Sequence, residues 1–199
     1  MDGAVVVHDR YQNYDAFPGL IHQLCTQHLI RDLEDAAETY PDAHWPVQAR
    51  EALQGLIHAA NTARAEGLPA IADQVAASLI HAFRHGVLVG LSDVPKVTGR
   101  KQRPCRDLLE CLRDRQNDVL RFTTDLRIPP TSNQAERDLR PAKTQQKISG
   151  SLRSEETTRH RYAIRGYIST AARHRASVLT ALRDALLGQP WMPPVPEPP

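Results

Sequence analysis

The sequence has no apolar run approaching the roughly 20 residues that a membrane-spanning helix needs. Its first seven residues also lack the basic and long apolar segments of a secretion signal. Cysteine is scarce: Cys25, Cys105 and Cys111 cannot all pair within the chain. Nothing therefore indicates an oxidising compartment, and a cytoplasmic location is the expectation.

A large net charge is also lacking, since the formal value is only +2 over 199 residues. This small sum hides an asymmetry. Residues 1–99 carry six Lys and Arg against twelve Asp and Glu, whereas residues 100–199 carry nineteen against eleven. Lysine is rare, so most of the basic residues are Arg, the side chain that grips phosphate with a planar fork. A basic second half indicates a polyanionic partner, and a solvated helical surface is the equally weighted alternative.

The length suits one globular domain, or a domain with a subdomain, and 41% apolar residues are enough for a core. Residues 4–7 form a continuous β-branched run that predicts a strand buried on both faces of a mixed sheet. Residues 20–24 predict a second strand. Helical apolar periodicity then follows through most of the chain, in residues 29–36, 53–60, 71–82, 108–122, 164–171 and 178–186. The fold class is mainly α with a short β remnant.

Two strands do not make a sheet that is stable by itself. The N-terminal part of the chain therefore resembles an incomplete core. Either a partner supplies the missing strands, or the chain is a fragment of something larger. The proline-rich residues 190–199 predict an extended tail.

Asp9 follows the first predicted strand directly. Mixed α/β sheets place reactive groups at the carboxyl ends of their strands. A turn-forming Asp is the simpler alternative for a single residue in this place.

Residues 129–141 predict the start of another helix, because two prolines precede Thr131 and Gln134 at capping-box spacing. At about 100° per residue, Glu136 shares a face of roughly 60° with three cations. These cations are Arg140, Lys143 and Lys147. The pattern suits a metal beside a phosphate backbone, or else a set of surface salt pairs. Pro141 should kink this helix or end it near Arg140.

Cys25 and His28 have a Cys-x-x-His spacing that can hold zinc, but a structural zinc site needs four ligands. Cys105 and Cys111 are separated by five residues and lie far along the chain, which is poor zinc-finger spacing. A buried Cys and a hydrogen-bonding His are the favoured interpretation.

Five segments together resemble transposases of the insertion sequence sixty-six family. They are HDRYQNY at 8–14, CTQHLIRDL at 25–33, NQAERDLRPAK at 133–143, YISTA at 167–171 and PWMPP at 190–194. The resemblance runs in order over nearly the whole chain, and its Asn-x-Ala-Glu-Arg-x-x-Arg-Pro motif is the most specific part.

The resemblance implies a ribonuclease-H-like core with an Asp-Asp-Glu triad that is interrupted by a helical insertion. Asp9 matches the second Asp and Glu136 matches the Glu. The implied organisation is a partial core at 1–39, the helical insertion at 40–125, core helices at 126–188 and the tail at 189–199. The first Asp belongs to a strand upstream of Val5, so the chain is expected to be a truncated transposase that is inactive alone.

The implied chemistry is DNA strand cleavage and transfer at two Mg²⁺ or Mn²⁺ ions, which are bound weakly here because one carboxylate is missing. The metal ligands are Asp9 and Glu136. Supporting roles fall to Cys25, His28, Arg31 and Asn133. The expected DNA contacts are Arg137, Arg140, Lys143, Lys147, Arg153, Arg159 and Arg161.

The chain departs from the family pattern at Arg10, where the family often has Gly, and at Ser132, where it often has Asn. Two other functions remain open: a non-catalytic DNA-binding or oligomerisation module left from a decayed bacterial mobile element, and a helical scaffold without a DNA role. A complementing N-terminal fragment or a second copy of the chain is the expected protein partner.

Overall fold

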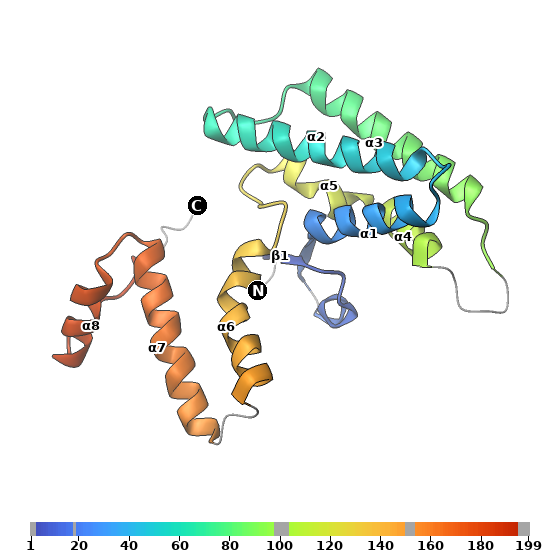
Figure 1. The fold of residues 1–199 in the computed structure, drawn as a ribbon. Coiled ribbons are helices and arrows are strands. Elements are labelled where there is room, and N and C mark those ends of the chain that lie inside the picture. Colours follow the sequence, from blue (N-terminus) through green and yellow to red (C-terminus); the bar gives the residue numbers. More distant parts are fainter. Residues whose placement is uncertain (1–2, 18, 98–103, 150–153, 195–199) are drawn as a thin grey trace. The chain divides into compact units, whose positions relative to one another are not determined.

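The computed structural model describes residues 3–17, 19–97, 104–149 and 154–194, without the side chains of 134, 135, 145, 146, 148 and 149. The described chain is mainly helical with one small sheet, as expected (Figure 1). It forms two compact units, Met1–Arg137 and Asp138–Pro199. The elements are β1 (Val5–His8), the 3₁₀ helix η1 (Gln12–Ala16), β2 (Ile21–Leu24), α1 (Thr26–Thr39), α2 (Trp45–Ala65), α3 (Asp73–Asp93), α4 (Pro104–Asp114), α5 (Gln116–Thr124), α6 (Asn133–Ser149), α7 (Glu155–Arg173) and α8 (Val178–Leu186).

Both predicted strands are present, and they pair in parallel with Val5 opposite Ile21 and His8 opposite Leu24. The predicted burial of the first strand on both faces is wrong for this chain. Val5 is 37% exposed, and only His8 at the strand's end is buried. In the described chain β2 is the single strand beside β1, so the second edge of β1 lacks the neighbour that a central strand has.

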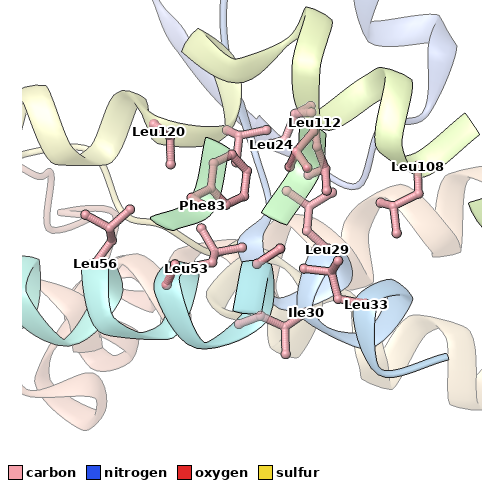
Figure 2. Close-up of a cluster of buried hydrophobic side chains, with 14 of the residues drawn as sticks. Leu24, Leu29, Ile30, Leu33, Leu53, Leu56, Phe83, Leu108, Leu112 and Leu120 are labelled. Atoms are coloured by element: carbon pink, nitrogen blue, oxygen red, sulfur yellow. The ribbon is translucent and has the colours of Figure 1, made fainter. Parts of the chain in front are cut away.

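The core of the first unit lies between the helices and β2, and Figure 2 shows its side chains converging from all of them. Apolar residues at helical spacing on α1 and α2, including Leu29, Leu33, Leu53 and Leu56, are fully buried. Phe83 from α3 reaches the same cluster. Each of these side chains contributes roughly 1.5–3 kcal/mol by leaving water, so the apolar periodicity read from the sequence accounts for this core.

α2 and α3 pack closely because α3 carries glycines at the contact. A Cβ built at Gly90 would lie 2.6 Å from a Leu109 methyl and 2.7 Å from the Trp45 ring. A Cβ at Gly86 would meet the backbone of α2 at 3.1 Å. Trp45 is fully buried in this contact. The two glycines therefore set how near α3 can approach α2 and α4.

The buried face of α3 agrees in part with the predicted one. Ile71 is buried in the core and Leu79 and Ala82 pack against it, whereas Val75 is 45% exposed. The buried positions of the helix are Phe83, Gly86, Val87 and Gly90. By length and composition alone α3 could cross a membrane, with a mean hydropathy of 1.3, and 22% of that window is buried. Glycine carries little weight in an apolar pattern, so the contact with α2 was not visible in the sequence.

The single helical pattern predicted over 108–122 is divided in two. Arg115, with φ −104° and ψ 26°, separates α4 from α5. Its guanidinium pairs with Asp118 in α5 at 3.0 Å. On the facing strand, the fully buried Gln23 donates Nε2–H to the Val119 carbonyl at 3.0 Å and accepts the Phe122 N–H at 2.9 Å. The amide of Gln23 thus joins β2 to the backbone of α5.

The helix predicted to begin near Ser132 is α6, but it does not end near Arg140. It continues through Pro141 to Ser149. A proline removes one N–H donor, and the turns on either side can keep their own hydrogen bonds.

Within the second unit, α7 and α8 pack against each other, and the Tyr167 hydroxyl donates to the Ala181 carbonyl at 3.1 Å. Ser154 and Ser177 cap the two helices by accepting the N–H groups of Thr157 and Thr180. The core of this unit is thin, because Ile164 is 57% exposed and Leu186 is 89% exposed.

We expect Gly90→Ala to lower the free energy of unfolding by about 1–3 kcal/mol, because its methyl group overlaps Trp45 and Leu109. The matched control is Gly166→Ala in α7, where no described atom outside the local helix backbone lies within 4 Å of the added Cβ. That change should stabilise its helix by roughly 0.5–1 kcal/mol. Urea unfolding followed by circular dichroism checks both, and equal effects would contradict the close approach at Gly90.

Candidate functional site

The carboxyl ends of the two strands lie together because β1 and β2 are parallel and in register up to His8 and Leu24. The Cys25 N–H extends this ladder by donating to the His8 carbonyl at 2.7 Å. Asp9 and Cys25 therefore leave the sheet at one edge. Polar groups that follow parallel strands in this way are positioned by rigid backbone.

Asp9 is exposed just beyond β1, and its Oδ1 accepts the Tyr11 N–H at 3.3 Å. The next residue, Arg10, has φ +69°, the left-handed conformation that favours glycine. The Arg10 guanidinium forms an ion pair with Asp32 of α1.

The segment before α6 is hydrogen-bonded to the N-terminus of α1, more than 100 residues away in sequence. Thr26 donates both its N–H and its hydroxyl to the Pro130 carbonyl, each at 2.9 Å. The Ser132 N–H donates to Cys25 Sγ at 3.3 Å. These bonds fix where α6 begins and thus where Glu136 lies.

Glu136 contacts two partners at this junction. Its Oε1 accepts the Ser132 hydroxyl at 2.8 Å and lies 3.8 Å from His28 Nδ1. The Glu136 and His28 side chains are 40% and 30% exposed, whereas Cys25 is 1% exposed. We call Cys25, His28 and Glu136 the thiol cluster, because their ligand atoms lie within 4.8 Å of one another.

A second group of ligand-type side chains surrounds the strands. His8 Nε2 and His22 Nδ1 are 3.1 Å apart, and Asp15 of η1 completes the group, which we call the imidazole cluster. Burial, with His22 and Arg115 adding to it, lowers the pKa of His8. Asp15 is already paired with Arg115 at 3.1 Å.

Sequence reasoning missed the imidazole cluster. His8 and His22 lie on one face of the sheet because His22 pairs with Val6, two residues before His8. The strand register is the signal that would have found them, and it was not known from the sequence.

The expected DNA contacts are solvent-exposed wherever the structure describes them, and Arg153 lies outside the described residues. None of those described forms an ion pair with a described acidic residue; they are Arg137, Arg140, Lys143, Lys147, Arg159 and Arg161. Arg161 also lines a hollow of about 560 Å³ with Arg165, a residue that the sequence analysis did not select. Arg31 is exposed on α1, and Asn133 is the half-buried first residue of α6.

A carboxylate just beyond a strand end and exposed basic side chains are features common in proteins that act on nucleic-acid phosphates. The family model described as transposase IS66 family matches residues 1–160, so the chain belongs to this family. The resemblance to the insertion sequence sixty-six transposases is thereby confirmed. Comparisons with curated proteins and with solved structures give no match.

We expect Arg10→Gly to change the free energy of unfolding by less than about 1 kcal/mol. Replacing Arg10 by glycine removes a strain of about 1 kcal/mol from the left-handed backbone. The variant also loses the partly exposed ion pair with Asp32, which contributes a similar amount, so the two effects offset each other. Burial raises the pKa of Asp32 and Arg10 lowers it, so this pKa should rise further in the variant.

NMR titration of the Asp32 carboxyl measures this shift, and Arg10→Lys is the control that keeps the charge. An unchanged Asp32 pKa in Arg10→Gly would show that the ion pair does not persist in solution.

Proposed function

We propose that Asp9 and Glu136 are two carboxylates of the divalent-metal centre of a DNA transposase that cleaves and joins strands by an Asp-Asp-Glu mechanism. Family membership supports transposition as the activity and a divalent metal as its requirement. The observation that carries the assignment is the double attachment of Cys25. Its N–H bonds to His8, next to Asp9, and its Sγ accepts the N–H of Ser132, one helical turn before Glu136.

The two side chains fit Mg²⁺ or Mn²⁺. Both offer carboxylate oxygens, which these hard cations prefer. Although 25 of the 199 residues are Lys or Arg, no ion pair to either type occupies Asp9 or Glu136 among the described residues. Neither carboxylate is therefore neutralised by a described Lys or Arg side chain.

A third carboxylate completes the proposed centre, from a strand that precedes β1 in a ribonuclease-H-like core. The second edge of β1, which has no strand beside it in the described chain, supports this placement. The half-exposed Val5 and Val7 of β1 would be covered by such a strand. The strand belongs either to a longer chain or to a separate polypeptide.

In this assignment the metal, when bound, stabilises negative charge on the phosphate oxygens during displacement at phosphorus. Asp9 holds it from the rigid end of β1, and Glu136 from the first turns of α6. The exposed arginines of α6 and α7 neutralise DNA phosphates and keep the DNA in register. We place this activity in the cytoplasm.

A second candidate function is DNA binding without catalysis, and the exposed basic residues are sufficient to support it. Arg159 and Arg161 are exposed on α7 in the second unit, whereas Asp9 and Glu136 belong to the first. Phosphate binding by α7 requires no metal centre.

We expect the chain alone to leave a transposon-end duplex uncut in Mg²⁺ and to cleave it when the upstream strand with its Asp is supplied in cis or as a separate polypeptide. Asp9→Ala or Glu136→Ala should then lower the cleavage rate about 100-fold or more, since losing a ligand exceeds the 10–100-fold cost of an outer-shell change. Strand-specific gel assays measure the rate.

The matched control is Glu38→Ala, which removes an exposed carboxylate from α1 and should leave cleavage unchanged. Cleavage by the unaided chain would show that the third carboxylate is misplaced. A complemented enzyme that is insensitive to Glu136→Ala but sensitive to Glu110→Ala would transfer the role to Glu110.

We expect Arg161→Ala to weaken DNA binding equally on unrelated duplexes and to lower the slope of log affinity against log salt by about 1, because one phosphate contact is lost. Arg113→Ala is the control, since Arg113 is equally basic but pairs with Asp114 on α4. Fluorescence anisotropy across a salt series checks the slopes. Binding that does not respond to salt would favour a scaffold without a DNA role.

A further inference from the structure

The thiol cluster contains a polar atom whose hydrogen bonding is unexplained. His28 Nδ1 is buried and has no hydrogen-bond partner among the residues and side chains that the structure describes. The nearest acidic oxygen, Glu136 Oε1, is 3.8 Å away, which is too long for a hydrogen bond. A charged His28 paired directly with Glu136 would close this distance to about 2.7–2.9 Å. The 3.8 Å separation is instead close to that of two ligand atoms on one tetrahedral cation.

Cys25 Sγ lies beside these atoms in a fixed position. It is 1% exposed, it accepts the Ser132 N–H, and its own N–H bonds to the His8 carbonyl. Cys25 is also the N-cap residue of α1, directly before Thr26. One sulfur, one imidazole nitrogen and one carboxylate oxygen therefore converge from two helix starts.

We propose that Cys25, His28 and Glu136 bind a thiolate-preferring divalent cation of the Zn²⁺ type, with a fourth position left to water. Tetrahedral zinc with Zn–S of about 2.3 Å and Zn–N or Zn–O of about 2.0–2.2 Å separates its ligand atoms by roughly 3.3–3.6 Å. The cluster's atoms lie within 4.8 Å of one another, so side-chain shifts of about 1 Å would bring them to this geometry. Binding replaces the thiol proton of Cys25, which passes to solvent.

This site uses chemistry that Mg²⁺ avoids. Mg²⁺ takes oxygen ligands and keeps its waters, whereas thiolate and imidazole suit zinc. Glu136 cannot turn its carboxylate to both cations at once. Zn²⁺ therefore inhibits strand cleavage by withdrawing Glu136, a consequence that rests on the function proposed above, whereas the zinc site itself does not.

Co²⁺ titration of the full chain tests the site, because a thiolate ligand gives Co²⁺ a charge-transfer band in the near ultraviolet. We expect this band at one equivalent and its loss when Zn²⁺ is added. His28→Gln and Glu136→Gln should each weaken Co²⁺ binding at least about tenfold. Cys25→Ser should abolish the band. Circular dichroism verifies that each variant is folded.

The chain offers matched controls. Cys105→Ser and Cys111→Ser remove the other free thiols, and His22→Gln breaks the imidazole cluster; all three should keep the band. A band lost in Cys105→Ser or Cys111→Ser, a band unaffected by His28→Gln, or Co²⁺ bound without a thiolate band would overturn the proposal.

Asp9→Asn separates this proposal from the proposed function. It should leave Co²⁺ and Zn²⁺ binding unchanged while it removes Mg²⁺-dependent cleavage by the complemented chain. An active complemented chain should lose cleavage at Zn²⁺ concentrations that fill the thiol cluster. Cleavage that persists with the cluster filled would refute inhibition, and an Asp9→Asn chain that loses the thiolate band would refute the ligand set.

Discussion

The segment from Leu126 to Ser132 is held from two sides, and the geometry of the site depends on this attachment. Arg64 of α2 donates to the carbonyls of Leu126 and Ile128. Thr26 and Cys25 of α1 bond to Pro130 and Ser132. The helices α1 and α2 thus fix the backbone that leads into α6, and these hydrogen bonds bring Glu136 close to His28 of α1.

This attachment gives Glu136 two possible roles. In the two proposals its carboxylate joins either Asp9 at a Mg²⁺ centre or Cys25 and His28 at a Zn²⁺ site. Cys25 is hydrogen-bonded both to His8 at the end of β1 and to Ser132 before α6, so it lies between the two proposed metal sites. A cation's preference for hard or soft ligands would then decide which partner Glu136 joins.

Much of the first unit was predictable because its core follows simple periodicities. The strands at 5–8 and 21–24 and the buried Leu residues of α1 and α2 agree with the sequence pattern. Three features did not follow from it. The close packing of α3 depends on its glycines. The division between α4 and α5 occurs at Arg115. The helix α6 continues through Pro141, where the loss of one N–H donor does not end it.

The sequence by itself determined the family, the mainly helical fold class, the strand that precedes Asp9 and the helix that places Glu136 in its first turns, because each is encoded by a local motif or a periodicity. It also pointed to Cys25 and His28 and argued against zinc for lack of further ligands. Only the tertiary structure brought Glu136 to them and paired His8 with His22. Contacts between residues more than 100 positions apart depend on strand register and loop attachment, which no local pattern encodes.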